Sequence, residues 1–265
     1  MPPGKAVLAV NVKQLFDLTG RVAIVSGGSM GLGRQMAEGL AEMGANLVLC
    51  ARKKERCEEA AETLRRRGVH TLALGCDVRD KAAIQQVVEE TLAKFGRIDI
   101  LINNAGVSWG ASVDEMTLEQ WDKVLSTNLT GTFLFCQAVG KAMEAQASGK
   151  IIKIASVQSE LARPGIAPYT ATKGAVKNLT RGMCADWAKY GLQINAIAPG
   201  YFKTPLNQAL VDNPEFSTWL EKRTPAARWG NVEELVGAAV FLSGKASSFV
   251  NGHTLYVDGG ITTSL

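Results

Sequence analysis

Residues 26–33 read Ser-Gly-Gly-Ser-Met-Gly-Leu-Gly, between a short apolar run at 22–26 and a helical pattern at 32–43. Glycines let the backbone turn sharply and approach a ligand closely, and the helix behind them offers free N–H groups at the positive end of its dipole. Such a turn can also be a plain strand-to-helix connection. Its position directly after the first expected strand favours a loop that binds the pyrophosphate of a nucleotide.

Apolar runs of strand length alternate with longer helical patterns through the rest of the chain. We expect strands at 22–26, 46–50, 71–76, 98–102, 151–155, 194–198 and 254–257, and helices at 32–43, 55–67, 81–95, 118–143, 169–190 and 232–242. This alternation implies right-handed crossovers. It predicts an α/β protein: a single-domain Rossmann fold with a doubly wound parallel sheet and helices on both faces.

Length and composition limit the class of protein. The chain has 265 residues, of which 46% are hydrophobic, and a net charge of +4 that is spread along it. This indicates one globular domain and gives no support for a nucleic-acid partner. No apolar stretch reaches the ~18 residues of a membrane span. We therefore expect a cytoplasmic protein with no membrane partner.

The histidines and cysteines argue against metal and hydrolase chemistry. There are two histidines and five cysteines, with neither a Cys-x-x-Cys pair nor the spacing of metal ligands. An odd number of cysteines in such a chain indicates reduced thiols. We expect no metal site. With only two histidines in the chain, a Ser-His-Asp hydrolase is not favoured either.

Two segments depart from the alternation. Residues 1–18 are expected to be an N-terminal extension of the domain at 19–265. The stretch at about 201–230 contains three prolines and mixed helical patches, with Phe202, Leu206, Phe216 and Trp219 as apolar anchors. A long insertion in a compact domain is usually functional, so we interpret this one as a mobile lid over the substrate.

A phenol and an ammonium lie four residues apart in Tyr169-Thr-Ala-Thr-Lys173. Residues at this spacing share one face of a helix, although an isolated pair means little. Ser156 ends the fifth expected strand, and Asn128 lies in the long helical region before it. A nearby cation favours phenolate, so Lys173 is expected to lower the pKa of Tyr169 toward neutrality. Ser156 can donate a hydrogen bond to an oxygen on which negative charge develops.

In order and spacing, Asn128, Ser156, Tyr169 and Lys173 resemble the catalytic tetrad of the short-chain dehydrogenase/reductase family. The resemblance covers roughly residues 19–262, and Ser26 replaces the threonine of that family's glycine motif. It implies a nicotinamide-dependent oxidoreductase that interconverts a secondary alcohol and a ketone. Tyr169 would then exchange the proton, and Lys173 would also hold the nicotinamide ribose. Asn128 would hold a water that links Lys173 to solvent.

The same resemblance identifies the residues expected to bind the cofactor. Asp77-Val78 is similar to the family's adenine-binding pair, the stretch 103–106 to its Asn-Asn-Ala-Gly motif, and Pro199-Gly200 to its Pro-Gly motif. The expected cofactor residues are Gly27, Ser29, Gly31, Leu32, Gly33, Arg52, Lys53, Asp77, Val78, Asn104, Ala105, Gly106, Tyr169, Lys173, Pro199, Gly200, Phe202 and Thr204.

The end of the second strand bears on the choice between NADP and NAD. Rossmann proteins that use NAD place an acidic residue there, whereas this chain has Ala51 followed by Arg52-Lys53-Lys54. A guanidinium can bind a 2′-phosphate through two hydrogen bonds. We therefore favour NADP, with NAD as the alternative. Met30 stands where many NADP-using relatives have an arginine in the glycine loop.

The substrate is less clearly indicated. Several strings resemble the gluconate 5-dehydrogenase group of the family, which interconverts gluconate and 5-ketogluconate: 158–163, 181–184, 198–204 and 222–230. That group often has basic residues after Asn-Asn-Ala-Gly, but here the stretch is the neutral Val107-Ser-Trp-Gly110. Gln158, Arg163 and Trp109 are the expected substrate residues.

Two alternatives stay open beside this reading. One is 3-oxoacyl-carrier-protein reduction or another carbonyl reduction, and the other is a non-catalytic protein that senses a nucleotide. Proteins of the second kind usually lose part of the tetrad, which is present here. The resemblance also implies a homotetramer that pairs through the helices at 118–143 and 169–190.

Overall fold

The computed structural model describes residues 11–205 and 207–264, so residues 1–10 of the expected extension and the anchor Leu206 lie outside it. One parallel sheet of seven strands, in the order β3-β2-β1-β4-β5-β6-β7, forms its centre. The strands are β1 (Val22–Ser26), β2 (Asn46–Ala51), β3 (Thr71–Gly75), β4 (Ile100–Asn103), β5 (Gly149–Ile154), β6 (Leu192–Pro199) and β7 (Thr254–Val257).

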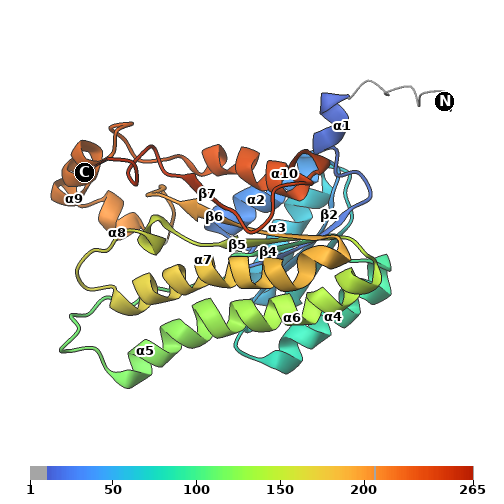
Figure 1. Cartoon of the computed structure of the whole chain (residues 1–265), viewed down its shortest axis with the longest axis horizontal. Coiled ribbons are helices and arrows are strands. Elements are labelled where there is room, and N and C mark those ends of the chain that lie inside the picture. The colour runs from blue at the N-terminus through green and yellow to red at the C-terminus, as the bar shows by residue number, and fades with distance from the viewer. Residues whose placement is uncertain (1–10, 206, 265) are drawn as a thin grey trace, which may run out of the picture.

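Helices cover both faces of the sheet. In Figure 1, α4, α6 and α7 lie on one side, and α2 and α10 lie on the other. The helices are α1 (Val12–Phe16), α2 (Gly31–Glu42), α3 (Lys54–Arg65), α4 (Lys81–Phe95), α5 (Leu118–Leu125), α6 (Gly131–Ala145), α7 (Ala167–Trp187), α8 (Gln208–Val211), α9 (Pro214–Arg223) and α10 (Val236–Ser243). The predicted α/β class and doubly wound parallel sheet are therefore confirmed.

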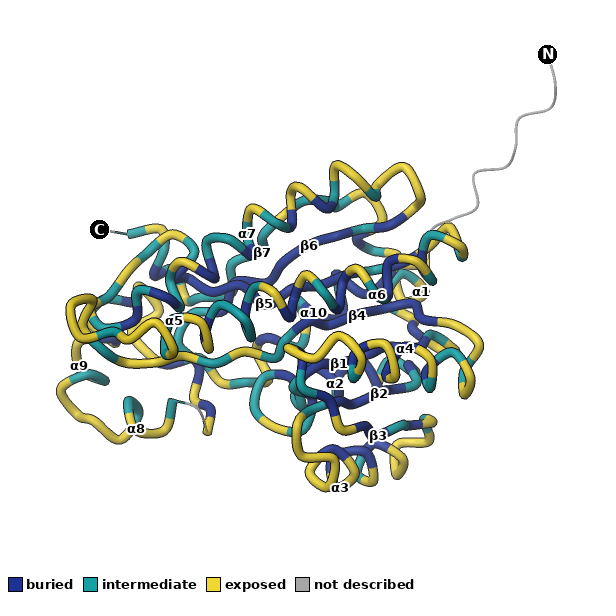
Figure 2. Tube along the Cα trace, turned by 90° about the horizontal axis from the view of Figure 1, so that it is seen from below, coloured by how far each residue is buried: buried dark blue, intermediate teal, exposed yellow. Residues whose placement is uncertain are grey.

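The sheet is buried because helices pack on both of its faces. All five residues of β1 are buried, and two hydrophobic clusters line the opposite faces. Figure 2 shows the central strands β1 and β4 as dark, buried chain, whereas β7 is intermediate and the outer side of α3 is exposed. Leu18, within the expected extension, is only 1% exposed and belongs to the core, so this part of the segment packs on the domain.

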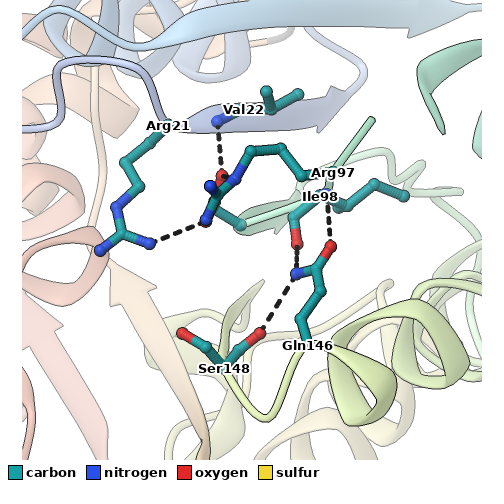
Figure 3. A network of polar contacts seen from close by, with 7 residues as sticks. Arg21, Val22, Arg97, Ile98, Gln146 and Ser148 are labelled. Carbon is teal, nitrogen blue, oxygen red and sulfur yellow. Dashed lines mark hydrogen bonds and ion pairs between the residues drawn. The ribbon is translucent and has the colours of Figure 1, made fainter. Parts of the chain in front are cut away.

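A polar network closes the amino ends of the central strands (Figure 3). The Asp99 carboxylate accepts hydrogen bonds from Arg21 (2.8 Å), from Arg97 (2.6 and 2.7 Å) and from the Val22 N–H (2.9 Å). The Gln146 side chain bonds both main-chain groups of Ile98. These bonds fix β1 against β4, and the carboxyl ends of the strands lie at the opposite edge of the sheet.

The strand order reverses between β1 and β4. The chain steps outward from β1 to β2 and β3, then returns to β4 on the other side of β1. In open α/β sheets, ligands bind in the crevice at the carboxyl edge beside such a switch point. The glycine loop follows β1 and the Asn-Asn-Ala-Gly stretch follows β4, so both lie at this crevice.

The helical region expected at 118–143 is not uniformly α-helical. A capping box between Thr117 and Gln120 begins α5, and a π-helical segment, Ser126–Thr130, joins it to α6. Such segments are rare, are usually single turns within α-helices, and often occur at functional sites. The five-residue turn contains Asn128, one of the expected tetrad.

Candidate active site

The glycine loop is held by the Asn104 side chain. Its Nδ2 donates to the carbonyl oxygens of Ser26 and Gly27, at 3.1 Å each. Gly27 has a φ of +65°, and a Cβ there would lie 2.8 Å from the Asn104 amide nitrogen. Gly31 also has a positive φ, +57°, but nothing lies within 4 Å of where its Cβ would be. The backbone at Gly31 is therefore open to a ligand, as the pyrophosphate prediction requires.

Ser26 connects the first and fourth strands. Its hydroxyl oxygen accepts hydrogen bonds from the N–H groups of Asn104 (3.0 Å) and Ala105 (3.1 Å), and its proton is donated to the Asn103 side chain (3.2 Å). A hydroxyl can accept two such bonds while it donates one. Serine thus fills the place that the family gives to threonine.

At the expected adenosine end of the site, one charged side chain is paired within the protein and another is exposed. The Asp77 carboxylate is bound by Arg79, at 2.6 Å between Oδ2 and Nη2, and this hydrogen bond lowers the pKa of Asp77. Arg52 is exposed just beyond β2, and no ion pair forms at its side chain within the described residues. Of these side chains, Arg52 is the one available to an anion.

A second guanidinium approaches the glycine loop from α3. Nη1 of Arg56 lies 3.9 Å from the Met30 sulfur. Arg56 gives no signal in the sequence, because its place beside residue 30 depends on how α3 packs. A cation is thus present near the loop position where relatives have arginine.

The other expected cofactor residues differ in how far they are buried. Ser29, Leu32, Ala105 and Gly200 are half-buried along the loops that follow the strands, whereas Lys53 and Gly106 are exposed. Val78 and Phe202 are 7% and 4% exposed, and both pack in hydrophobic clusters. Their side chains therefore belong to the core, and their expected contact with the cofactor stays a prediction.

Asn128 fastens the loop after β4 to α7. Its amide donates to the Val107 oxygen (2.8 Å) and to the Thr172 hydroxyl (3.2 Å), and its Oδ1 accepts from the Val107 N–H (2.8 Å). The side chain is 2% exposed. Asn128 therefore positions the backbone next to Gly106 as well as the helix that carries Tyr169.

Ser156, Tyr169 and Lys173 come together at the end of β5. Ser156 is 7% exposed, and its Oγ accepts a hydrogen bond from the Gln158 N–H at 3.1 Å, beginning a short 3-10 turn. Nζ of Lys173 donates to the Ile154 carbonyl at 2.6 Å and lies 5.4 Å from the centre of the Tyr169 ring. The expected spacing on one helix face is thus realised beside the serine.

The titration of this cluster differs from the sequence-based expectation. Burial raises the pKa of Tyr169, and interaction with the Ser156 hydroxyl partly opposes this. Burial also lowers the pKa of Lys173 to about 8. The protein matrix alone therefore does not supply the lowered tyrosine pKa that we expected from Lys173, although the lysine can exchange its proton near neutral pH.

The segment expected as a lid leaves and rejoins the domain at one point. Phe202 forms a β-bridge with Gly230, reinforced by hydrogen bonds from Gly230 N to Tyr201 O (2.9 Å) and from Lys203 N to Gly230 O (3.0 Å). Within the segment, Phe216 packs between Trp219 and Trp229, with ring centres 5.4 and 6.1 Å away. The described part thus contains helices α8 and α9 on an aromatic cluster, and its mobility stays a prediction.

The substrate residues expected from the sequence separate into two groups. Gln158 and Arg163 follow Ser156: Gln158 donates a hydrogen bond to the hydroxyl of Tyr201, a residue not expected at the substrate, and Arg163 lowers the pKa of that hydroxyl. Trp109 is 36% exposed, and Nζ of Lys123 lies 4.6 Å from the centre of its ring. The neutral stretch 107–110 therefore has a cation beside it after all, supplied by α5.

Two cavities lie next to these groups. One of about 110 Å³ is lined by residues from the base of the insertion and the end of β7, among them Tyr201, Phe202, Thr224 and Asp258. An apolar groove of about 290 Å³ lies between the start of α5 and that of α7, lined by Leu118, Trp121 and Pro168 among others. The groove adjoins the first turn of α7, the helix that carries Tyr169 and Lys173, and neither cavity is lined by a residue of the expected tetrad.

Two further findings concern metal and membrane. Across residues 11–205 and 207–264, no three acidic, histidine or cysteine side chains group as metal ligands. None of the helices in this described part is both long and apolar enough to cross a bilayer.

The chain is similar to known proteins over nearly its whole length. Residues 27–262 match a family model described as enoyl-(acyl carrier protein) reductase. The chain is 54% identical over 251 residues to gluconate 5-dehydrogenase of Gluconobacter oxydans, which covers 95% of this chain and 98% of the relative. It is 46% identical to 5-keto-D-gluconate 5-reductase of Escherichia coli, over 96% of this chain and 100% of the relative.

A solved structure is also similar to this chain in sequence and in fold. The crystal structure of a gluconate 5-dehydrogenase from Burkholderia cenocepacia, in complex with NADP and tartrate, superimposes with a TM-score of 0.93. It is 50% identical and covers 96% of this chain and 100% of its own.

Proposed function

The chain belongs to the short-chain dehydrogenase/reductase family and is an NAD(P)-dependent oxidoreductase that acts on a CH–OH group, and from this premise we propose that it interconverts D-gluconate and 5-keto-D-gluconate. The complete tetrad and the relatives named for enzymatic activities argue against the reading as a non-catalytic nucleotide sensor. Identity of about half over nearly the whole chain supports the choice of substrate.

One observation carries the catalytic part of the proposal. Ser156 follows β5 and acts to lower the pKa of the Tyr169 hydroxyl, and Lys173 lies one helical turn further on, bonded to Ile154 with its ammonium 5.4 Å from the centre of the tyrosine ring. When bound, the nicotinamide supplies or accepts the hydride. This chain's own groups then need to hold the substrate oxygen and move one proton, and the cluster contains a hydrogen-bond donor and an acid–base pair for that purpose.

Each residue of the proposed tetrad has a distinct task. Tyr169 gives its hydroxyl proton to the ketone oxygen during reduction and takes it back during oxidation. Ser156 donates a hydrogen bond to the same oxygen as negative charge develops on it. Lys173, with a pKa of about 8, can return a proton to Tyr169 near neutral pH. Asn128 holds α7 and the loop after β4 in place through its three hydrogen bonds.

For the cofactor, we propose NADP in preference to NAD. Arg52 is exposed beyond β2 and has no ion pair within the described residues, and Arg56 lies against Met30 of the glycine loop. Two guanidinium groups beside the expected ribose can bind a 2′-phosphate through charge-assisted hydrogen bonds. The Burkholderia relative, whose structure contains NADP, supports this preference.

We also propose that the enzyme is a cytoplasmic homotetramer. None of the five cysteines forms a disulfide, as is usual for proteins of reducing compartments. Phe133 on α6 and Leu118 at the start of α5 are 42% and 73% exposed, which suits helices that pack on a second copy.

The decisive experiment is a spectrophotometric assay of the purified protein with NADPH or NADH and a panel of ketones. We expect NADPH oxidation with 5-keto-D-gluconate and NADP reduction with D-gluconate. Turnover of a 3-oxoacyl thioester, with none of 5-keto-D-gluconate, would contradict the substrate and favour carrier-bound ketones.

A further inference from the structure

A buried amide lacks a partner beside the proposed catalytic group. Gln158 is only 6% exposed, and its Nε2 donates to the Tyr201 hydroxyl at 3.3 Å. Its Oε1 is fully buried and accepts no hydrogen bond within residues 11–205 and 207–264. A buried acceptor left unpaired costs about 1–3 kcal/mol of stability. An unpaired buried group in a folded protein calls for an explanation, and a functional role is one of them.

Tyr201 is held with its hydroxyl next to this amide. Its ring packs against Phe216 at 5.8 Å and edge-on against Trp229 at 5.9 Å between ring centres. Its hydroxyl oxygen accepts from Gln158 Nε2, and the charge and N–H groups of Arg163 act to lower the pKa of that hydroxyl. Because both neighbours are donors, the tyrosine proton is free to be donated to a third group.

Arg163 supplies a positive charge at the same place. It is half-buried, and no ion pair involves it in the described part of the chain. Its positive charge lowers the pKa of both the Tyr201 and the Tyr169 hydroxyls. Arginine has five N–H donors, of which a carboxylate can take two in parallel.

We propose that Arg163, Gln158 and Tyr201 form a subsite for the 2-hydroxycarboxylate end of the substrate, with Arg163 on the carboxylate. Gln158 would accept the proton of the adjacent hydroxyl, and Tyr201 would donate to a substrate oxygen. This inference rests on the proposed function and deepens it. Tyr201 is its new member, a specificity residue that belongs to the insertion rather than to the tetrad.

The three groups complement this ligand class in chemistry. A 2-hydroxycarboxylate presents a bidentate anion next to a hydroxyl that both donates and accepts. The subsite has one cation, one unpaired acceptor and one free donor: the Arg163 guanidinium, Oε1 of Gln158 and the Tyr201 hydroxyl. A neutral ketose would leave Arg163 without an anion and would therefore gain less from the subsite.

The test compares two ketones that differ at one end. 5-Keto-D-gluconate carries a carboxylate where L-sorbose carries a hydroxymethyl group. For Arg163→Gln we expect the KM for 5-keto-D-gluconate to rise about 10- to 100-fold, the range for a lost hydrogen bond to a charged group. The kcat/KM for L-sorbose should stay within about threefold of wild type on the same scale. Tyr201→Phe, which keeps the ring packing, should raise the same KM by a smaller factor.

Arg66→Gln is the matched control, because Arg66 is exposed at the end of α3, and it should change neither value. Arg163→Lys provides a second variant that keeps the charge and should recover part of the affinity. Equal losses with both ketones in Arg163→Gln would overturn the subsite, as would an unchanged KM for 5-keto-D-gluconate.

Binding of tartrate separates this inference from the proposed function. Tartrate is a 2-hydroxycarboxylate, and its affinity for the enzyme with NADP can be measured by calorimetry without turnover. If wild type turns over neither ketone, the proposed function fails, yet weaker tartrate binding in Arg163→Gln would still support the subsite. Equal tartrate affinity in the two proteins would refute it.

Discussion

Nζ of Lys173 donates a 2.6 Å hydrogen bond to the carbonyl of Ile154, the last residue of β5. This bond ties α7 to the strand that leads into Ser156. The lysine is buried, with a pKa of about 8, and its ammonium faces one main-chain oxygen and the ring of Tyr169. The same side chain therefore sets the distance between helix and strand and holds the proton that Tyr169 needs.

Removal of the tyrosine hydroxyl should separate chemistry from binding. Tyr169→Phe is expected to lower kcat by at least ~10²-fold, the scale of general acid–base catalysis. NADPH affinity, measured by fluorescence titration, should be nearly unchanged. Tyr190→Phe, in an exposed tyrosine beyond α7, is the control. Near-normal turnover of Tyr169→Phe would remove Tyr169 from the proposed role.

The two arginines at the proposed 2′-phosphate site should affect one cofactor only. We expect Arg52→Ala to weaken NADPH binding by ~1.5–3 kcal/mol, the range for hydrogen bonds to charged groups. Arg56→Ala should weaken it by less, because this guanidinium also lies against Met30. NADH affinity should not change in either variant. Equal affinity of wild type for NADH and NADPH would rule out the assignment.

Lys153 on β5 gives a prediction about stability. Its side chain is 0% exposed, its Nζ has no hydrogen-bond partner in the described residues, and burial lowers its pKa. Lys153→Met should stabilise the protein by about 1–3 kcal/mol at pH 7, because the unpaired polar group is removed.

The pH dependence of that difference has a definite sign. Between the lowered folded pKa and the unfolded value near 10.4, the unfolded state binds more protons at Lys153, so wild-type stability rises with pH. The advantage of Lys153→Met should therefore shrink from pH 7 toward pH 10 in urea denaturation. A constant or growing advantage would contradict this account of the buried amine.

The Asp99 network at the amino edge of the sheet should lose its stabilising effect at acidic pH. Burial alone would raise the pKa of Asp99, but hydrogen bonds from Arg97, Arg21 and Val22 hold it below its usual value. Its stabilising effect is thus present above the unfolded pKa of about 3.9 and is lost as pH falls through the lower folded value. Asp99→Asn should cost about 1–3 kcal/mol at pH 7, since both arginines are half-exposed and screened. Denaturant midpoints that differ as much at pH 2 as at pH 7 would refute this.

The homotetramer can be tested by light scattering of the purified protein at micromolar concentration. The expected particle has four times the chain mass of 28.3 kDa. Phe133→Asp on α6 should dissociate it, because a charge would replace an exposed apolar group on the expected contact face. A stable monomer of wild type would refute the assembly.

The elements that depend on local pattern were predictable from the sequence. The bounds of β1, α4 and β7 agree with the expected ranges, since apolar strands and capped helices depend on neighbouring residues. The glycine loop, Ser156 and the pair Tyr169 and Lys173 could be found for the same reason. Their spacing along the chain directly reflects the strand ends and the helix face on which they lie.

What the sequence did not reveal depends on contacts between distant segments. The π-helical turn at Asn128 leaves no periodic signal, because one wide turn does not change the apolar pattern around it. Arg56 beside Met30, Lys123 over Trp109 and Tyr201 beside Gln158 each join residues from separate elements. The raised pKa of Tyr169 likewise follows from burial, which spacing alone cannot give.

The closure of the insertion at Phe202 and Gly230 has a consequence for how such an enzyme can change over evolutionary time. Since the two ends meet, residues can be added or lost between them without altering the distance that the intervening chain must span. The entropy of closing a loop grows slowly, by about 0.6 kcal/mol for each doubling of length. Mutations in this region can therefore change the substrate specificity at little cost to folding stability. The nucleotide crevice is built by other strands and is selected separately.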